Sequence, residues 1–341
     1  MIFARVPLDH AEGAILAHSV PGAELEPGMA ARLRKGVVLG PAEIAYLRAA
    51  GVAQVMVARL EAGDVDEDSA ATRLAEALVP DPTAAGLRLT PAFTGRVNLN
   101  AVGPGVVEMD VAAVHALNRI DPSITLATLV PYARVEAGML VGTVKIISYA
   151  VGAEDLSRAC DLARGAIRVR PVLHEDASLI LTEVAGLPDK LASKARASVE
   201  ARLHALGMRL AECLTVPHDE AAIAAALRAA RGAMVLVLTG SATSDLLDTA
   251  PEGLRLAGGV VARFGMPVDP GNLLFYGSLG ARPVIGLPGC ARSPALNGAD
   301  WVLERLACGL PLHDDDIAAM GVGGLLKEIP IRPQPREGRG G

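Results

Sequence analysis

The fold prediction begins with residues 234–259, whose sequence is MVLVLTGSATSDLLDTAPEGLRLAGG. The apolar run Met234–Leu238 predicts a buried strand, because it is short and turn-forming residues follow it at once. Pro251 and Glu252 predict the first turn of a helix, where proline is tolerated and an acid faces the positive end of the helix dipole. The stretch therefore predicts a strand, a loop of small residues and a helix start.

The loop of this stretch has the chemistry of an anion site. Residues 239–244 are small and mostly hydroxylated, so backbone N–H groups can approach an anion closely, and the helix start favours negative charge. Asp245 and Asp248 fit such a site if a cation such as Mg²⁺ bridges them to phosphate. The alternative is an ordinary strand-to-helix loop whose Ser and Thr side chains form caps and turns. The loop contains neither the lysine of a P-loop nor a GxGxxG pattern.

Strands and helices alternate throughout residues 171–310. The segments SLILTEV, MRLAECLTV, NLLFYGSL and RPVIGLPG predict further strands. Ser293 and Pro294 predict the N-cap and the first position of a helix over residues 293–309. The alternation predicts an α/β domain of three layers around a mostly parallel sheet.

Ligands of such sheets bind beyond the carboxyl ends of the parallel strands, which meet at one edge. The side chains expected at this edge belong to Thr182 and Glu183, to the loop 239–248 and to the corner 288–292. Their convergence is the strongest physical indication of a site in this sequence.

The rest of the chain is harder to assign to one architecture. The predicted segments are 1–80, a mixed α/β segment; 81–170, an α+β, strand-rich region; 171–312, the α/β domain; and 313–341, an extension whose tail, RPQPREGRGG, is expected to be disordered. Arg96, Asn98 and Lys145 lie in predicted strands, where they face either solvent or a site at a neighbouring domain or subunit.

Composition limits the class of function. The chain has 341 residues, of which 51% are apolar and only 3% aromatic, so its core consists of Ala, Val, Leu and Ile. No apolar run approaches the ~18 residues of a membrane-spanning helix, and the first residues lack a secretory signal, so cytoplasmic residence is expected. A net charge of −6 without a basic run argues against nucleic acid as a partner. The four cysteines lack the spacing of a zinc site.

Two sequence motifs, at residues 239–252 and 286–294, resemble the molybdopterin-binding domain shared by molybdopterin adenylyltransferases and molybdenumtransferases. Thr239 and Gly240 match the start of the adenylyltransferase motif TGGTG, and Asp248, Pro251 and Glu252 match its later Asp and Pro-Glu. In the molybdenumtransferase motif GGxSxGDYD, the first Asp corresponds to Asp245; in its motif GLPGNPVS, the counterparts are Pro288, Gly289 and Ser293. The resemblance covers most of residues 175–310.

The whole chain looks most similar to two-part bacterial molybdopterin-binding proteins. Residues 35–60 resemble the molybdenumtransferase segment that precedes the molybdopterin domain, although other segments intervene here. The sequence also departs from the family motifs. Ser241–Thr243 replaces Gly-Thr-Gly, Leu247 replaces an Arg, and Cys290 replaces an Asn.

The resemblance implies a site for molybdopterin, a pterin that carries a dithiolene and a phosphate. Its phosphate would be held by the loop residues Thr239, Gly240, Ser241, Thr243 and Ser244. Asp245 and Asp248 are the catalytic candidates and the ligands of a possible Mg²⁺. The further residues expected at the ligand are Glu183, Pro288, Gly289, Arg292 and Ser293.

Three functions follow from this resemblance. The first is an enzyme of cofactor maturation, which transfers adenylyl from ATP or inserts molybdate with Asp245 and Asp248 as its acids. The second is a binding module that presents the pterin to a cytidylyltransferase or to a molybdoenzyme apoprotein. The third is a competence-damage-type domain that acts on nicotinamide nucleotides. On family analogy, the chain is also expected to form a homo-oligomer.

Overall fold

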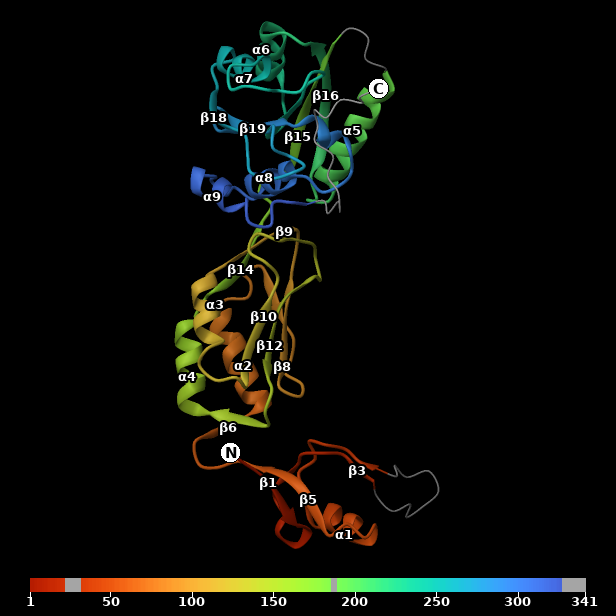
Figure 1. Ribbon diagram of the computed structural model, residues 1–341, viewed down its shortest axis with the longest axis vertical. Coiled ribbons are helices and arrows are strands. Elements are labelled where there is room, and N and C mark those ends of the chain that lie inside the picture. The colour runs from red at the N-terminus through yellow and green to blue at the C-terminus, as the bar shows by residue number, and fades with distance from the viewer. Residues whose placement is uncertain (22–31, 185–188, 327–341) are drawn as a thin grey trace, which may run out of the picture. The chain divides into compact units, whose positions relative to one another are not determined.

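A computed structural model describes residues 1–21, 32–184 and 189–326 of the chain (Figure 1). These residues form two compact units. The first comprises residues 1–103 and 107–170, and the second comprises residues 104–106 together with the chain from residue 171 onward. The tail that the sequence predicts to be disordered lies outside the described residues.

The N-terminal part of the first unit is a small antiparallel sheet with one helix. Its strand order is β1-β5-β2, and a separate pair, β3-β4, precedes the helix α1. The elements are β1 Ile2–Pro7, η1 Leu8–His10, β2 Ile15–Leu16, β3 Val20–Pro21, β4 Arg32–Leu33, α1 Pro41–Ala49 and β5 Gln54–Arg59. Pro41 begins α1, as the sequence predicts, and Gly51 follows the helix with a positive φ of 74°.

The rest of the first unit packs three helices against short sheets. A four-stranded antiparallel sheet has the order β10-β12-β8-β7, and two further sheets have the orders β11-β9-β14 and β13-β6. The elements are β6 Asp64–Asp66, α2 Glu67–Leu78, β7 Leu87–Leu89, β8 Arg96–Ala101, β9 Gly105–Met109, α3 Val111–Leu117, β10 Ile124–Thr128, β11 Arg134–Val135, β12 Leu140–Ile146, β13 Ala150–Gly152, α4 Ala153–Leu162 and β14 Ile167–Pro171.

Alternation along the strands explains where the polar residues of this region lie. In β8, exposed Arg96 and half-buried Asn98 alternate with buried Val97 and Leu99, and the buried pair packs in the same core as Leu74 of α2. The polar side chains therefore occupy the sheet face that α2 does not cover. Helix α2 belongs to the predicted segment 1–80, but it packs in one core with strands of the predicted segment 81–170.

The second unit is built on one six-stranded sheet with the order β16-β15-β17-β20-β19-β18. Strands β16, β15, β17 and β20 pair in parallel, whereas β19 pairs antiparallel with β20, and β18 pairs antiparallel with β19. The elements are β15 Asp176–Glu183, α5 Asp189–His204, β16 Arg209–Pro217, α6 Glu220–Ala229, β17 Met234–Leu238, α7 Thr249–Leu256, β18 Val260–Phe264, β19 Phe275–Leu279, β20 Arg282–Leu287, η2 Gly289–Arg292, α8 Gly298–Ala307 and α9 Asp314–Ala319. The predicted mixed α/β class is confirmed.

Alternate residues of the central strands contribute to two separate cores. Leu179 and Leu236 pack with α5 and α8, while Ile180 and Val235 pack with α6 and α7. All five residues of β17 are buried, which explains why this strand reads as a continuous apolar run.

Pro251 and Glu252 lie in the first turn of α7, as the sequence predicts, whereas the predicted start of the next helix at Ser293 and Pro294 is wrong because a better cap lies elsewhere. Helix α7 begins at Thr249, because the Asp248 carboxylate accepts a hydrogen bond from the Thr249 N–H at 2.7 Å. Helix α8 begins at Gly298 instead of at Pro294, and residues 289–292 form the 3₁₀ helix η2. Asn297 caps α8 and receives a reciprocal contact, because its N–H donates to the Asp300 carboxylate at 2.8 Å.

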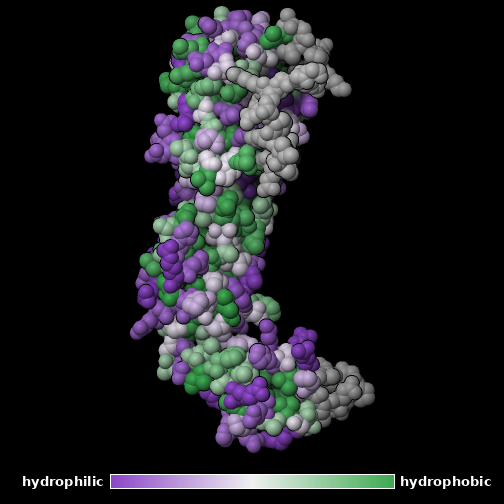
Figure 2. Space-filling model, in the orientation of Figure 1, coloured by the Kyte–Doolittle hydropathy of each residue, from purple (hydrophilic) through white to green (hydrophobic). Residues whose placement is uncertain are grey.

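The surface of both units mixes residue types. The face drawn in Figure 2 intersperses hydrophobic residues with hydrophilic ones, which is normal for folded proteins. Within the described ranges, no helix has the length and apolar character needed to cross a bilayer.

Candidate ligand site at the carboxyl ends of the parallel strands

The strand register brings three of the predicted loops together. Leu181 of β15 pairs with Leu238 of β17, and Leu238 pairs with Leu287 of β20. The next residues along these strands are Thr182, Thr239 and Pro288, so the three loops leave the sheet at the same level. Glu183 ends β15 beside Thr182 and is exposed.

A polar chain that the sequence analysis missed connects the first two strand ends to a third. The Gly240 N–H donates to the Thr182 hydroxyl at 2.8 Å, and this hydroxyl lies 2.8 Å from Nδ1 of His218, just past the end of β16. The His218 N–H also donates to the Glu183 carbonyl at 3.1 Å. Thr182 is only 5% exposed, so its hydroxyl needs these partners. The signal in the sequence is that His218, like Thr182 and Thr239, stands at the carboxyl end of a strand.

The loop after β17 offers backbone donors. Within the part of the chain that the structure describes, the N–H groups of Ser241, Ala242 and Thr243 have no protein acceptor. Thr243 is 6% exposed, and its hydroxyl likewise has no partner among the described residues. Ser244 differs, because its N–H donates to the Asp248 carboxylate at 2.8 Å and its hydroxyl lies 3.3 Å from the same oxygen. Three consecutive donors are therefore available to an anion.

Asp248 closes this loop onto the helix α7. One carboxylate oxygen accepts from Ser244 and the other caps the helix at Thr249. Burial raises the pKa of this carboxyl, but the hydrogen bonds from Ser244 and Thr249, with a smaller contribution from the charge of His218, together lower the pKa below its ordinary value of 3.8. Asp248 is thus ionised at neutral pH, and its carboxylate stabilises the loop and the start of α7.

We expect Asp248→Asn to remove the Ser244 contact while keeping a helix cap, and to lower the free energy of unfolding by about 1 kcal/mol near neutral pH. Because the folded-state pKa is lowered, this contribution is complete above the ordinary pKa and disappears as pH falls through the folded value. Denaturation of wild type and variant from pH 6 down to pH 2 should therefore show two curves that converge in acid. Asp315→Asn in the exposed first turn of α9 is the charge-matched control. A constant difference at all pH values would contradict this account.

Asp245 lies in the same loop but plays a smaller structural part. It is exposed, and one carboxylate oxygen accepts a hydrogen bond from the Leu247 N–H at 2.8 Å, which leaves the other oxygen open to solvent. Across residues 1–21, 32–184 and 189–326, no three His, Cys, Asp or Glu side chains gather as a metal cluster. Of the predicted Mg²⁺ pair, Asp245 has one carboxylate oxygen without a protein donor among the described residues, whereas both oxygens of Asp248 accept hydrogen bonds.

Arg292 links the third loop to the second. From η2 its guanidinium donates to the carbonyl oxygens of Thr239 and of Gly289. Burial lowers the pKa of this guanidinium, although an arginine stays charged at neutral pH. Two of its five N–H donors have these protein acceptors, and the other three have none within the described residues. A half-buried cation with free donors at this edge can bind an anion.

The corner before Arg292 is shaped by its backbone. Pro288 precedes η2 and its carbonyl accepts from the Ala291 N–H at 2.9 Å. A Cβ at Gly289 would lie 3.3 Å from Nη1 of Arg292, so the glycine leaves room for the guanidinium. The Ser293 hydroxyl accepts from the Ala295 N–H at 3.3 Å and so stabilises the turn after η2. The structure thus brings the predicted residues of this corner to the rim but gives several of them structural contacts.

Comparisons with known proteins place two segments in families. Residues 178–307 match a family described as a probable molybdopterin binding domain. Residues 5–59 match a family described as a domain of unknown function. No curated protein matches the chain. A crystal structure of the molybdopterin biosynthesis MoeA protein from Pyrococcus horikosii matches with 11% identity over 90% of this chain and 75% of that one, at a TM-score of 0.31. The second unit of this chain therefore carries a domain of the probable molybdopterin binding family.

Proposed function

We propose that the second unit binds molybdopterin at the carboxyl ends of its parallel strands and acts in molybdenum cofactor biosynthesis. The observation that carries this proposal is a run of three N–H groups, at Ser241, Ala242 and Thr243, that have no acceptor among the described residues and lie inside a domain of the probable molybdopterin binding family. Molybdopterin has a phosphate that suits these donors. The guanidinium of Arg292, tied to the same loop at Thr239, supplies the positive charge.

The remaining groups of the rim suit the pterin ring. The exposed carboxylate of Asp245 has an oxygen that can accept hydrogen bonds from a pterin amino group. The hydrogen-bonded side chains of His218 and Thr182 add polar groups beside Gly240. Glu183 ends β15, and Ser293 follows η2 after β20. The residues present therefore fit a phosphorylated pterin.

The hydrogen bonds that Asp248 accepts favour binding and presentation of the pterin over Mg²⁺-dependent chemistry. Its carboxylate accepts three hydrogen bonds, from the Ser244 N–H, the Ser244 hydroxyl and the Thr249 N–H. A cation at Asp248 would compete with these donors for the carboxylate. We therefore propose a carrier that presents the pterin to a cytidylyltransferase or a molybdoenzyme apoprotein. Adenylyl transfer from ATP or insertion of molybdate remains the catalytic alternative, with Asp245 as its exposed acid.

The test is the pterin that remains bound when the full chain is purified from cells that make molybdopterin. After oxidation, its fluorescence and mass identify and quantify it. We expect wild type to carry pterin and Ser241→Asp to lose at least about 90% of it, because a carboxylate there repels the phosphate at close range. Ser157→Asp on the exposed face of α4 is the matched control and should retain wild-type content. Equal content in wild type and Ser241→Asp would count against this site.

Two additions to the same experiment separate the alternatives. Incubation of the pterin-loaded chain with Mg²⁺ and ATP, or with molybdate, should give no adenylylated or molybdenum-containing product if the chain is a carrier. A product that disappears in Asp245→Asn would instead favour the enzyme. Thermal unfolding with nicotinamide nucleotides should show no stabilisation, and a clear increase in Tm would favour the third function.

A further inference from the structure

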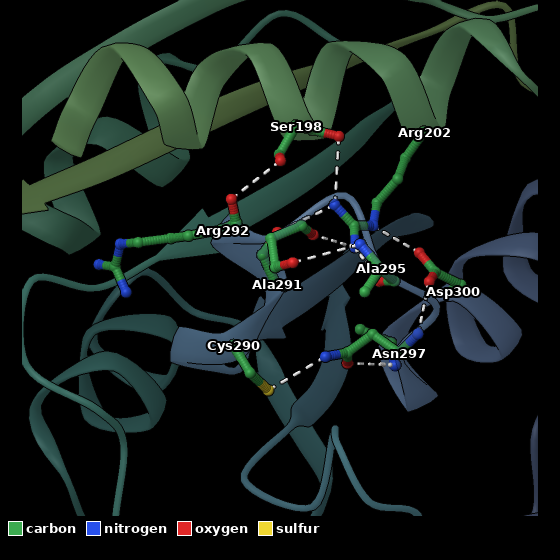
Figure 3. A network of polar contacts seen from close by, with 10 residues as sticks. Ser198, Arg202, Cys290, Ala291, Arg292, Ala295, Asn297 and Asp300 are labelled. Carbon is green, nitrogen blue, oxygen red and sulfur yellow. Dashed lines mark hydrogen bonds and ion pairs between the residues drawn. The ribbon is translucent and has the colours of Figure 1, made fainter. Parts of the chain in front are cut away.

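A buried arginine lies behind the corner that carries Arg292. Arg202, on α5, is about 10% exposed and forms an ion pair with Asp300 of α8 through Nε. Its two terminal nitrogens donate to backbone carbonyls, Nη1 to Ala291 at 2.9 Å and Ser198 at 3.2 Å, and Nη2 to Ser293 at 2.8 Å and Ala295 at 3.1 Å (Figure 3). The whole guanidinium fork is therefore satisfied inside the protein.

These contacts hold one side of the loop of residues 291–295, which contains Arg292. The Ser198 hydroxyl, one helical turn before Arg202, donates to the Arg292 carbonyl at 2.9 Å. The carbonyls of Ala291, Arg292 and Ser293 are thus all bound from α5. The Arg292 side chain extends from the other side of this loop, away from the Arg202 guanidinium (Figure 3), and reaches the Thr239 carbonyl.

Beyond the contacts from α5, the loop is held by its own short hydrogen bonds, by Asn297 and by the Arg292 side chain. Its own backbone supplies a bond from Ala291 to Pro288 and one from Ser293 to Cys290, and Asn297 donates to the Cys290 sulfur at 3.0 Å. A planar fork that binds several carbonyls at once defines their positions more tightly than an ammonium on a flexible stem would. Asp300 in turn fixes the fork while its other oxygen accepts from the Asn297 N–H.

We propose that Arg202 is a positioning residue of the ligand site: it acts through the backbone of residues 291–295 to place the Arg292 guanidinium at the phosphate. This inference rests on the proposed function, because it concerns the same site. It adds that the affinity for the phosphorylated pterin depends on a side chain that does not touch the ligand.

The test compares Arg202→Lys with Val199→Ala in the full chain. Lysine keeps the charge and the aliphatic stem but cannot bind the carbonyls as a fork. Val199 is fully buried on the same helix, so its truncation destabilises the unit without changing any of these hydrogen bonds. We expect Arg202→Lys to reduce bound pterin more than tenfold and to accelerate amide exchange in residues 289–297, and Val199→Ala to do neither. Ser198→Ala, which removes only the contact to Arg292, should show both effects more weakly.

The outcomes are distinct. Pterin content in Arg202→Lys equal to that in Val199→Ala would overturn the positioning role while the proposed function stands. Faster exchange in Arg202→Lys without loss of pterin would also overturn it, because the corner would then move without consequence for the ligand. A wild-type chain that carries no pterin would refute the proposed function itself, and the same exchange measurement would then show that Arg202 serves only the fold. If Arg202→Lys does not fold, Ser198→Ala decides by the same two measurements.

Discussion

Replacing Gly286 with alanine is expected to lower the free energy of unfolding of the second unit by about 3 kcal/mol or more. Gly286 is buried in β20 and pairs with Phe275 of β19. A Cβ at position 286 would lie 1.8 Å from Cε1 of the Phe275 ring, well inside van der Waals contact. Phe275 is 1% exposed, so its ring cannot turn outward. The ring occupies the space that a side chain at residue 286 would need.

Trp301 makes this prediction measurable for the second unit alone. It is the only tryptophan of the chain and lies in α8, so its fluorescence during denaturation reports this unit. The control is a double-mutant cycle with Phe275→Leu, which replaces the ring by a smaller side chain. The double variant should be less destabilised than the sum of the two single variants by at least about 1 kcal/mol. Additive effects would show that the clash with the ring is not the cause.

The sequence predicted best those elements whose signal is local. Pro41 and Gly51 mark the two ends of α1, and the apolar run Met234–Leu238 is β17 over its full length. The place where the loops after β15, β17 and β20 leave the sheet also followed from the sequence, because strand ends in a parallel sheet share one edge. The family of the C-terminal domain followed from two short motifs and is confirmed.

The sequence predicted poorly what depends on competition between partners. Ser293 has the residue type and the following proline of an N-cap, yet its carbonyl is bound by Arg202 and the helix starts five residues later. Asn297 is the N-cap instead, because Asn297 and Asp300 form a capping box in which each side chain accepts from the backbone of the other. For Asp248, which stays a candidate metal ligand or catalytic acid, the sequence did not predict that Ser244 and Thr249 donate to its two oxygens.

The residues that were missed act over long sequence separations. His218 reaches Thr182 across 36 positions, and Arg202 reaches Ser293 across 91. No periodicity or spacing encodes such contacts, since each depends on how two strands or helices pack. A histidine directly after a strand and an arginine within an amphipathic helix are ordinary on sequence alone. Only the register of the sheet gives His218 a place beside the predicted loop.

Replacing Arg292 with glutamine should weaken pterin binding by about 10- to 100-fold, which is the range for loss of a charge-assisted hydrogen bond to an anion. Glutamine keeps an amide donor near the carbonyls of Thr239 and Gly289 but removes the positive charge. The Thr239 carbonyl directly precedes the loop whose N–H groups we propose as ligands of the phosphate. The substitution therefore removes a positive charge that is held at the start of this loop.

The measurement is the dissociation constant of the oxidised, phosphorylated pterin by fluorescence titration, at several salt concentrations. Arg209→Gln is the control, because Arg209 begins β16 at the opposite, amino edge of the same sheet and pairs there with Asp176. Both variants change the net charge equally, so a general electrostatic effect would weaken both alike. We expect Arg209→Gln to bind as wild type does.

Salt separates a direct contact from an indirect one. If the Arg292 guanidinium meets the phosphate, wild-type affinity falls as salt rises, and Arg292→Gln shows a shallower dependence because one charge pair has gone. If Arg292 only ties η2 to β17, the variant loses affinity through a looser loop, and the salt dependence stays as steep as in wild type. Unchanged affinity in Arg292→Gln would remove the cation from the proposed site and leave the N–H groups of Ser241–Thr243 as the anchor of the phosphate.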